Sequence, residues 1–180
     1  MTKLSDHVHF KLIDGTQFPG NLEFYSTDSG DEFRKAGIFF LFFHGELIYI
    51  GFTENNQDVI AERLVRQLAT ITLRDHRIQF TRAALNELHA KEDVFNTFFN
   101  LPIPIIANKD FVTSVNRVAF ASYHWDEFIN LNDETLSRFE FKWYPNPSLG
   151  NHPSIEALCN EMKKKYKPRC NQEYRRPSIE

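Results

Sequence analysis

The stretch from Gly37 to Ile50 constrains the fold of this 180-residue chain more than any other feature. Residues 37–43 are apolar without interruption and include four phenylalanines, which is typical of a strand buried on both faces. Residues 44–46 then provide a turn that contains Gly45, and residues 47–50 provide a second apolar run. We therefore predict a hairpin in the central β-sheet.

A second pair of strands is predicted near the N-terminus. Between His7 and Leu12 apolar and polar residues alternate, so Val8, Phe10 and Leu12 would share one face of a strand. Turn signals follow at residues 14–15 and 19–20, and residues 22–25 would form the partner strand.

A helix is expected after the central hairpin. Asp58 is suited to cap its N-terminus. Apolar residues with helical spacing would form its buried face: Ile60, Leu64, Leu68 and Ile71. Residues of about 78–100 and 112–130 are then predicted to be mostly helical, divided by the proline-containing segment Leu101–Pro104.

The C-terminal third predicts one more strand and one more helix. Phe139, Phe141 and Trp143 alternate with polar residues, as expected of a strand. A helix should run from about Ser154 to Tyr166, because Pro168 stops it. Its buried face is predicted to carry Ile155, Leu158, Met162 and Tyr166.

The order of these elements predicts an α+β fold, in which helices flank a small central mixed sheet. We find no internal repeat or dividing linker, so we expect a single domain over residues 1–180. Its core would comprise residues 37–71 and 138–171, with an N-terminal hairpin within residues 1–34 and a helical insertion over about 75–135.

Charge and composition indicate which compartment and which partners to expect. The chain carries a net charge of −3, but the segment Lys163–Arg176 holds seven basic residues and one acid. Such a basic end is either a phosphate-binding surface or a solvated helix end. The chain has no apolar run long enough to span a membrane and no apolar N-terminal segment, and its two cysteines lack CxxC spacing. We therefore expect a cytoplasmic protein with no membrane partner.

The hairpin and its surroundings resemble the GIY-YIG nuclease superfamily. The resemblance is carried by Gly37-Ile38-Phe39, by Tyr49-Ile50-Gly51 and by the Arg63-bearing helix that follows. Residues 156–171 are similar to the end of the GIY-YIG domain in the bacterial excision-repair incision subunit, and related endings occur in restriction and homing endonucleases of the family. The matched pieces cover slightly more than a third of the chain.

The resemblance implies hydrolysis of nucleic-acid phosphodiesters with one divalent metal ion, Mg²⁺ or Mn²⁺. By this resemblance Tyr49 would form or assist the general base, Arg63 would steady the scissile phosphate, and Asn171 would support the site. Each role has a physical reason, because a fixed guanidinium and a metal ion stabilise the charge that gathers on the phosphoryl oxygens in the transition state.

The sequence departs from the family pattern at several positions. Phe39 replaces the first-motif tyrosine, and Phe52 stands where many relatives have lysine. Counting back from Pro168 and Asn171 places the family's metal-binding glutamate at Cys159, and a thiol is a poor Mg²⁺ ligand. Glu156 is the substitute we predict as metal ligand, since it lies about 60° around the helix and about 4.5 Å along it from that position.

The sequence therefore predicts a metal-dependent endonuclease acting on double-stranded DNA. Its nucleic-acid-binding residues would be Arg66, Lys163, Lys164, Lys167 and Arg169, and the N-terminal hairpin and insertion would supply target recognition or homodimer contacts. Two alternatives stay open: a GIY-YIG fold without catalysis that binds nucleic acid or protein, and an interaction protein that never touches nucleic acid. Tyr49 would then be an ordinary core aromatic and Arg63 a solvated helix residue.

Overall fold

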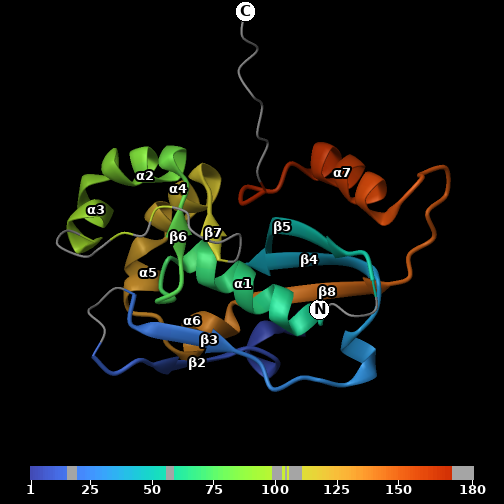
Figure 1. Cartoon of the computed structure of the whole chain (residues 1–180), viewed down its shortest axis with the longest axis horizontal. Helices are drawn as coiled ribbons and strands as arrows, with labels where there is room; N and C mark the ends of the chain where they lie inside the picture. Colours follow the sequence, from blue (N-terminus) through green and yellow to red (C-terminus); the bar gives the residue numbers. More distant parts are fainter. Residues whose placement is uncertain (16–19, 56–58, 99–102, 104, 106–110, 172–180) are drawn as a thin grey trace, which may run out of the picture.

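A four-stranded sheet forms the centre of the computed structural model, which describes residues 1–180 except 16–19, 56–58, 99–102, 104, 106–110 and 172–180 (Figure 1). Its strand order is β1 (Thr2–Lys3), β8 (Phe139–Pro145), β4 (Gly37–Phe43) and β5 (Glu46–Thr53). Helices cover the sheet, so the predicted α+β class is confirmed. All pairings within this sheet are antiparallel. A mixed sheet is predicted from the sequence, but parallel pairing joins only β6 (Gln79–Phe80) to β7 (Val112–Thr113) among the named strands.

The central hairpin forms as predicted from its apolar runs. β4 pairs with β5 from Gly37 opposite Thr53 to Phe43 opposite Glu46, with a register shift between Leu41 and Phe42. His44 and Gly45 both have positive φ values, of 50° and 75°. A two-residue turn with φ above zero at both positions has the twist that suits a hairpin.

The two motif glycines of the hairpin are required by close packing. A Cβ added at Gly51 would lie 2.2 Å from Cζ of Phe39, and one added at Gly37 would lie 2.5 Å from Cη2 of Trp143. Both distances are far below van der Waals contact, so neither position can take a side chain without moving a large aromatic ring.

The N-terminal segment contributes more than the predicted hairpin. β2 (His9–Leu12) pairs with β3 (Leu22–Tyr25) as expected. β1 and the 3-10 turn Leu4–Asp6 precede this hairpin, and β1 adds an edge strand to the central sheet. The strand begins at His9, two residues later than predicted, so Val8 precedes it; Val8 is fully buried, whereas Leu12 is 68% exposed. A second 3-10 turn, Asp31–Phe33, leads into β4.

Helix α1 (Ile60–Thr72) packs against the larger apolar cluster, to which Phe39, Leu41 and Phe43 contribute alternate side chains of β4. The face predicted from helical spacing is confirmed, since Ile60, Leu64, Leu68 and Ile71 are all fully buried. Asp58, the predicted cap, lies outside the described residues, and the residue before the helix is Val59.

The region between α1 and β8 is helical, as predicted, with two short strands that the sequence does not announce. Its helices are α2 (Arg82–His89), α3 (Glu92–Phe98), α4 (Val115–Tyr123), α5 (Trp125–Ile129) and α6 (Asp133–Ser137). β6 and β7 are only two residues long, too short for a periodic pattern to mark them. Most of the predicted divider Leu101–Pro104 lies outside the described residues.

Arg74 ties this region to the N-terminal hairpin. Its guanidinium donates to the carbonyls of Phe128 and Ile129 and to the side chain of Asn21. The side chain is buried, and burial lowers its pKa to about 10.

Helix α7 (Ile155–Tyr166) packs on the opposite face of the sheet, and Ser154 caps it by accepting a hydrogen bond from the Ala157 amide. Ile38 and Ile50 form a second, smaller apolar cluster with Cys159 of this helix. Leu158 and Met162 pack at its margin as predicted, but Tyr166 is 51% exposed, so its predicted burial is wrong. Within the described residues, none of the helices is both long and apolar enough to cross a membrane.

Candidate functional site

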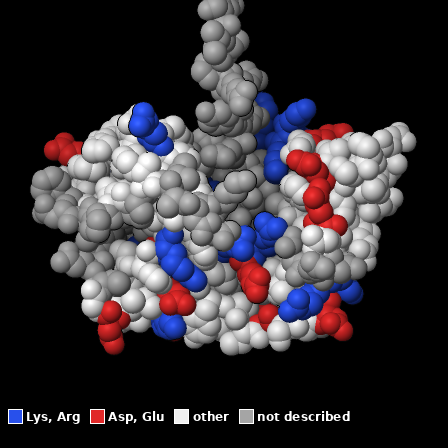
Figure 2. All heavy atoms as spheres, in the orientation of Figure 1, with Lys and Arg blue, Asp and Glu red and all other residues white. Residues whose placement is uncertain are grey.

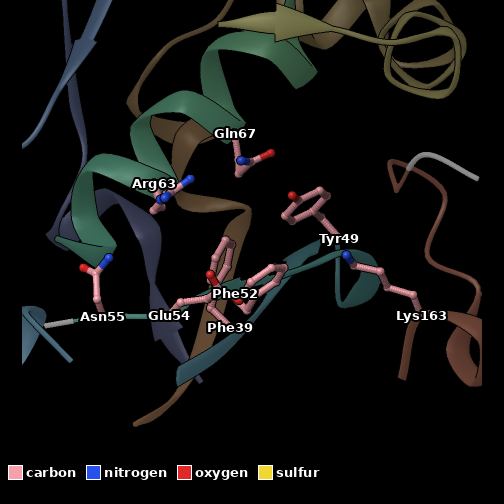
Figure 3. Close-up of a pocket in the computed structure, with 9 residues that line it drawn as sticks. Phe39, Tyr49, Phe52, Glu54, Asn55, Arg63, Gln67 and Lys163 are labelled. Carbon is pink, nitrogen blue, oxygen red and sulfur yellow. The ribbon is translucent and has the colours of Figure 1, made fainter. Parts of the chain in front are cut away.

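A pocket of about 410 Å³ opens at the β5 edge of the sheet (Figure 3). It is lined by residues from β4, β5, the following loop, α1 and α7: Phe39, Tyr49, Gly51, Phe52, Glu54, Asn55, Arg63, Gln67 and Lys163. The pocket therefore gathers side chains from both ends of the chain. Of the predicted site residues it brings together Tyr49, Arg63 and Lys163.

Tyr49 and Arg63 face the same space from different elements (Figure 3). The Tyr49 ring is half-buried and packs against Phe39, with 5.8 Å between ring centroids. Arg63 is half-buried on α1, opposite the strand that carries Tyr49. A phenol and a guanidinium arranged in this way can hold a phosphate and a water molecule between them.

Arg117 of α4 packs on Tyr49 and holds the helix that carries Arg63. This residue was not predicted from the sequence. Its guanidinium lies over the Tyr49 ring, 5.2 Å from the ring centroid. It also donates to Oε1 of Gln67 at 2.8 Å and to Oγ1 of Thr70 at 2.6 Å. Arg117 thus links the aromatic ring of β5 to the pocket face of α1. No spacing rule connects residue 117 to residue 49, so the sequence offers no signal for this contact.

Asn171 lies behind the pocket and supports the strand that carries Tyr49. Its side chain is buried, accepts a hydrogen bond from the Ile50 amide and donates one to the Ile50 carbonyl, both at 2.8 Å. The Cys170 amide donates to the Ile48 carbonyl in the same way. These contacts satisfy backbone groups on the outer edge of β5. The predicted supporting role of Asn171 is consistent with this geometry.

The predicted metal ligand on α7 stands apart from the pocket. Glu156 is exposed and is not one of the lining residues. Cys159 is fully buried, and desolvation raises the pKa of its thiol despite the nearby ammonium of Lys163, which acts to lower it. Lys163 itself reaches the pocket, with Nζ 5.6 Å from the centroid of the Phe52 ring. The pocket face of α7 therefore supplies a cation.

The pocket's donor atoms that suit a metal ion are oxygens. Glu54 provides the carboxylate among the lining residues, and Tyr49 and Asn55 add a phenol and an amide oxygen, whereas Oε1 of Gln67 already accepts a hydrogen bond from Arg117. Such a set fits a hard cation such as Mg²⁺, which is held by few protein ligands and keeps most of its waters. In the part of the chain that the structure describes, no group of three or more His, Cys, Asp or Glu residues is arranged to hold a metal.

The other predicted nucleic-acid-binding residues lie around the pocket. Arg66 lines a separate hollow with Tyr25, Arg77 and Phe111. Lys164 and Lys167 are exposed at the end of α7, whereas Arg169 pairs with Glu46 at 3.0 Å. Figure 2 shows Lys and Arg side chains over α1 and beside α7, with Asp and Glu side chains between them on the same face. Arg175 and Arg176, in the predicted basic run, lie outside the described residues.

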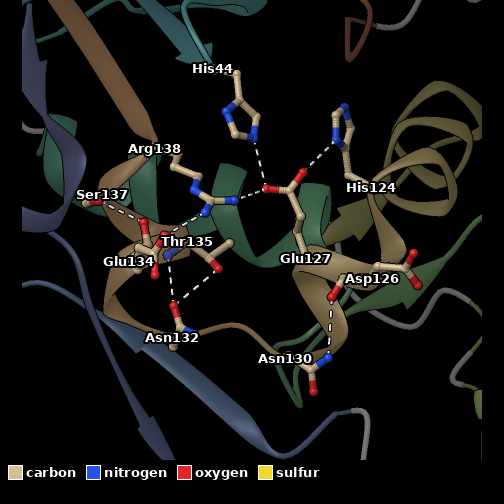
Figure 4. Close-up of polar contacts among 10 residues, drawn as sticks. All are labelled: His44, His124, Asp126, Glu127, Asn130, Asn132, Glu134, Thr135, Ser137 and Arg138. Atoms are coloured by element: carbon tan, nitrogen blue, oxygen red, sulfur yellow. Dashed lines mark hydrogen bonds and ion pairs between the residues drawn. The ribbon is translucent and has the colours of Figure 1, made fainter.

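A second polar cluster joins the turn of the central hairpin to α5 (Figure 4). The carboxylate of Glu127 contacts His44 Nε2 at 2.8 Å, His124 Nδ1 at 3.1 Å and the guanidinium of Arg138. Burial alone would raise the pKa of Glu127, but these three hydrogen bonds outweigh it, so the pKa lies below its ordinary value. The carboxylate is therefore fully engaged, and the cluster acts as a joint between elements.

Comparison of the chain with protein-family models, with curated proteins and with solved structures gives no match.

Proposed function

We propose that this chain is a divalent-metal-dependent endonuclease of GIY-YIG type that hydrolyses phosphodiester bonds, with double-stranded DNA as substrate. The observation that carries the proposal is the convergence of Tyr49, Arg63 and Lys163 on one pocket from three separate elements. Two buried free thiols, Cys159 and Cys170, suit a reducing compartment, and a cytoplasmic location is part of the proposal.

The pocket's cations would bind and orient the scissile phosphate. Arg63 approaches from α1 and Lys163 from α7, so a phosphate between them would be held from two sides. Both charges are fixed before the reaction, and they stabilise the added negative charge of the phosphoryl transition state without reorganisation.

Tyr49 would act on the attacking water. Hydrolysis forms a bond between the water oxygen and phosphorus and breaks the bond from phosphorus to one strand. The Tyr49 hydroxyl can hold that water or take its proton, and Arg117 fixes the ring from behind. A bound Mg²⁺ or Mn²⁺ would supply further charge neutralisation at the phosphate.

Plasmid cleavage by the purified protein in Mg²⁺ or Mn²⁺ tests this proposal. Arg63→Ala should lower the cleavage rate by about 10²-fold or more, because it removes a fixed charge from the reacting phosphate. Arg82→Ala is the matched control, since Arg82 is an exposed arginine on α2 that is not among the lining residues of this pocket. Equal rates for Arg63→Ala and the wild type would count against the proposal.

A nucleic-acid-binding module without catalysis is the second candidate. It is favoured by one observation: the predicted position of the family's glutamate holds Cys159, which is buried between Ile38 and Ile50. This candidate gains if the wild type binds DNA, with a salt-dependent affinity, and leaves plasmid intact in both metals. A protein that binds no DNA would instead favour the interaction-protein alternative. Sedimentation of the purified chain would show whether a homodimer forms.

A further inference from the structure

We infer that Glu54, and not a residue of α7, is the carboxylate that holds the divalent metal ion in this pocket. The inference rests on the proposed function and goes beyond it by moving the metal ligand to a different element. Glu54 directly follows β5, the strand that carries Tyr49. The metal site would thus have shifted from the last helix to the loop after the central hairpin.

The backbone just before Glu54 is anchored to the segment that precedes β4. Thr53, the last residue of β5, is buried and donates from its hydroxyl to the Lys35 carbonyl at 2.7 Å. Figure 3 shows the Glu54 carboxylate directed inward beside Phe39 and Phe52, facing the space that Arg63 and Tyr49 share.

The other carboxylates around the pocket have different surroundings. Glu161 pairs with His152 at 3.3 Å, and Glu46 pairs with Arg169. Glu62, on α1, lines the hollow that contains Arg66. Glu156 is exposed on α7 outside the lining. Among the described residues that form the pocket wall, Glu54 is therefore the carboxylate available to a cation.

The chemistry of the pocket suits this assignment. One carboxylate, with amide and phenol oxygens nearby and with the substrate's phosphate oxygens, is a sufficient ligand set for Mg²⁺. Arg63 and Lys163 give the pocket more positive than negative charge, so without DNA it should bind a cation with modest affinity, within the range that a Tb³⁺ titration covers. The phosphate of the substrate reverses this balance, and binding of metal and DNA should be mutually reinforcing.

Terbium luminescence provides a test that does not depend on cleavage. Tb³⁺ is a hard, oxygen-seeking ion whose emission is sensitised by a nearby tyrosine, and Tyr49 lines the same pocket. The wild type should give sensitised emission that Mg²⁺ displaces. Glu54→Gln keeps the side-chain shape and removes its charge. It should weaken Tb³⁺ binding at least as much as the roughly tenfold caused by loss of an outer-shell partner.

Glu156→Gln is the matched control and should bind Tb³⁺ like the wild type. Both side chains are exposed, so thermal unfolding of either variant should match the wild type. Tb³⁺ binding that is unchanged in Glu54→Gln, that is lost in Glu156→Gln instead, or that is absent from the wild type would overturn the inference.

The cleavage assay separates this inference from the proposed function. If the wild type cleaves DNA and Glu54→Gln cleaves equally well, the enzyme stands and Glu54 is removed from its site. If Tb³⁺ binding depends on Glu54 but the wild type never cleaves, the metal site stands and the nuclease proposal fails.

Discussion

The side chain of Asn171 should contribute substantially to the free energy of unfolding. It makes two hydrogen bonds to the backbone of Ile50 and is buried. Asn171→Ala would leave an amide and a carbonyl of β5 without their partner, at a cost of about 1–3 kcal/mol for each group that stays dry. We expect urea unfolding to show a loss of about 2–4 kcal/mol for this variant.

Asn116→Ala provides the comparison for that measurement. Asn116 is exposed and donates to the Asn171 carbonyl at 2.8 Å, so its loss leaves the β5 pairing intact. A stability loss for Asn171→Ala no larger than that for Asn116→Ala would show that the Ile50 contacts are replaced by water.

Substitution of Arg117 by lysine separates the effect of its charge from that of its hydrogen-bonding geometry. Arg117→Lys keeps a cation near Tyr49. Its single ammonium lacks the planar fork by which two guanidinium nitrogens of Arg117 donate separately to Gln67 and Thr70. In the proposed nuclease we expect a fall of about tenfold in kcat with little change in KM, because the reacting groups lose their positioning while the DNA contacts remain. Single-turnover cleavage would check this, and a rise in KM alone would argue against a positioning role.

The residues of the pocket differ in how far the sequence could predict them. Tyr49 and Arg63 were predicted from the resemblance of the hairpin and the following helix to the GIY-YIG pattern, and both line the pocket. Arg117 was not, because its contact with Tyr49 depends on how α4 packs. Glu54 belongs to no sequence motif, and only its place in the folded pocket indicates a role for it. Glu156 shows the limit of helix geometry, which gives an angle along α7 but not the position of the pocket.

At the scale of elements, Glu127 joins the hairpin turn to α5 through His44, His124 and Arg138. Its pKa is lowered in the folded state. A carboxylate of this kind adds stability above its unfolded pKa, and this stability is lost as the pH falls through the folded pKa. The contribution should therefore be complete at neutral pH and disappear in acid, below the ordinary value of 4.5.

Glu127→Gln tests this pH dependence. At pH 7 the variant should unfold at a temperature lower by roughly 2 °C. In acid the difference from the wild type should shrink towards zero, because the wild-type carboxylate is then protonated too. A difference that is constant across this range would mean that packing, and not charge, gives Glu127 its effect.

The elements themselves fall into two groups with respect to prediction. β4, β5, β8, α1 and α7 were predictable because each is long enough to show a period or a continuous apolar run. β1, β6 and β7 are two residues long and exist through pairing with strands distant in sequence. Tyr166 has the right spacing for the buried face of α7, but it lies at the helix end and remains exposed.

At the scale of the molecule, charged side chains are distributed unevenly although the net charge is negative. The chain carries −3, and Lys and Arg side chains lie over α1 and beside α7 among acidic side chains (Figure 2). If this face binds DNA, Lys164→Gln and Lys167→Gln should each reduce the slope of log affinity against log salt by about 0.9. Fluorescence anisotropy with a labelled duplex at several salt concentrations would measure it.

Arg169→Gln serves as the control within the same basic segment. Arg169 is paired with Glu46, so its charge is partly neutralised, and its loss should change the slope less. Slopes that are the same for all three variants and the wild type would return this segment to the role of a solvated surface.

The pairing of Ile50 with Asn171 joins residues that lie 121 positions apart. A ribosome releases β4, β5 and α1 long before it reaches Asn171, so the nascent chain carries Tyr49 and Arg63 without the support behind them. Lys163 also arrives only with α7, close to the same moment. The pocket therefore cannot be completed before α7 and Asn171 have been synthesised, and translation that stops before α7 yields a product in which the site has never been assembled.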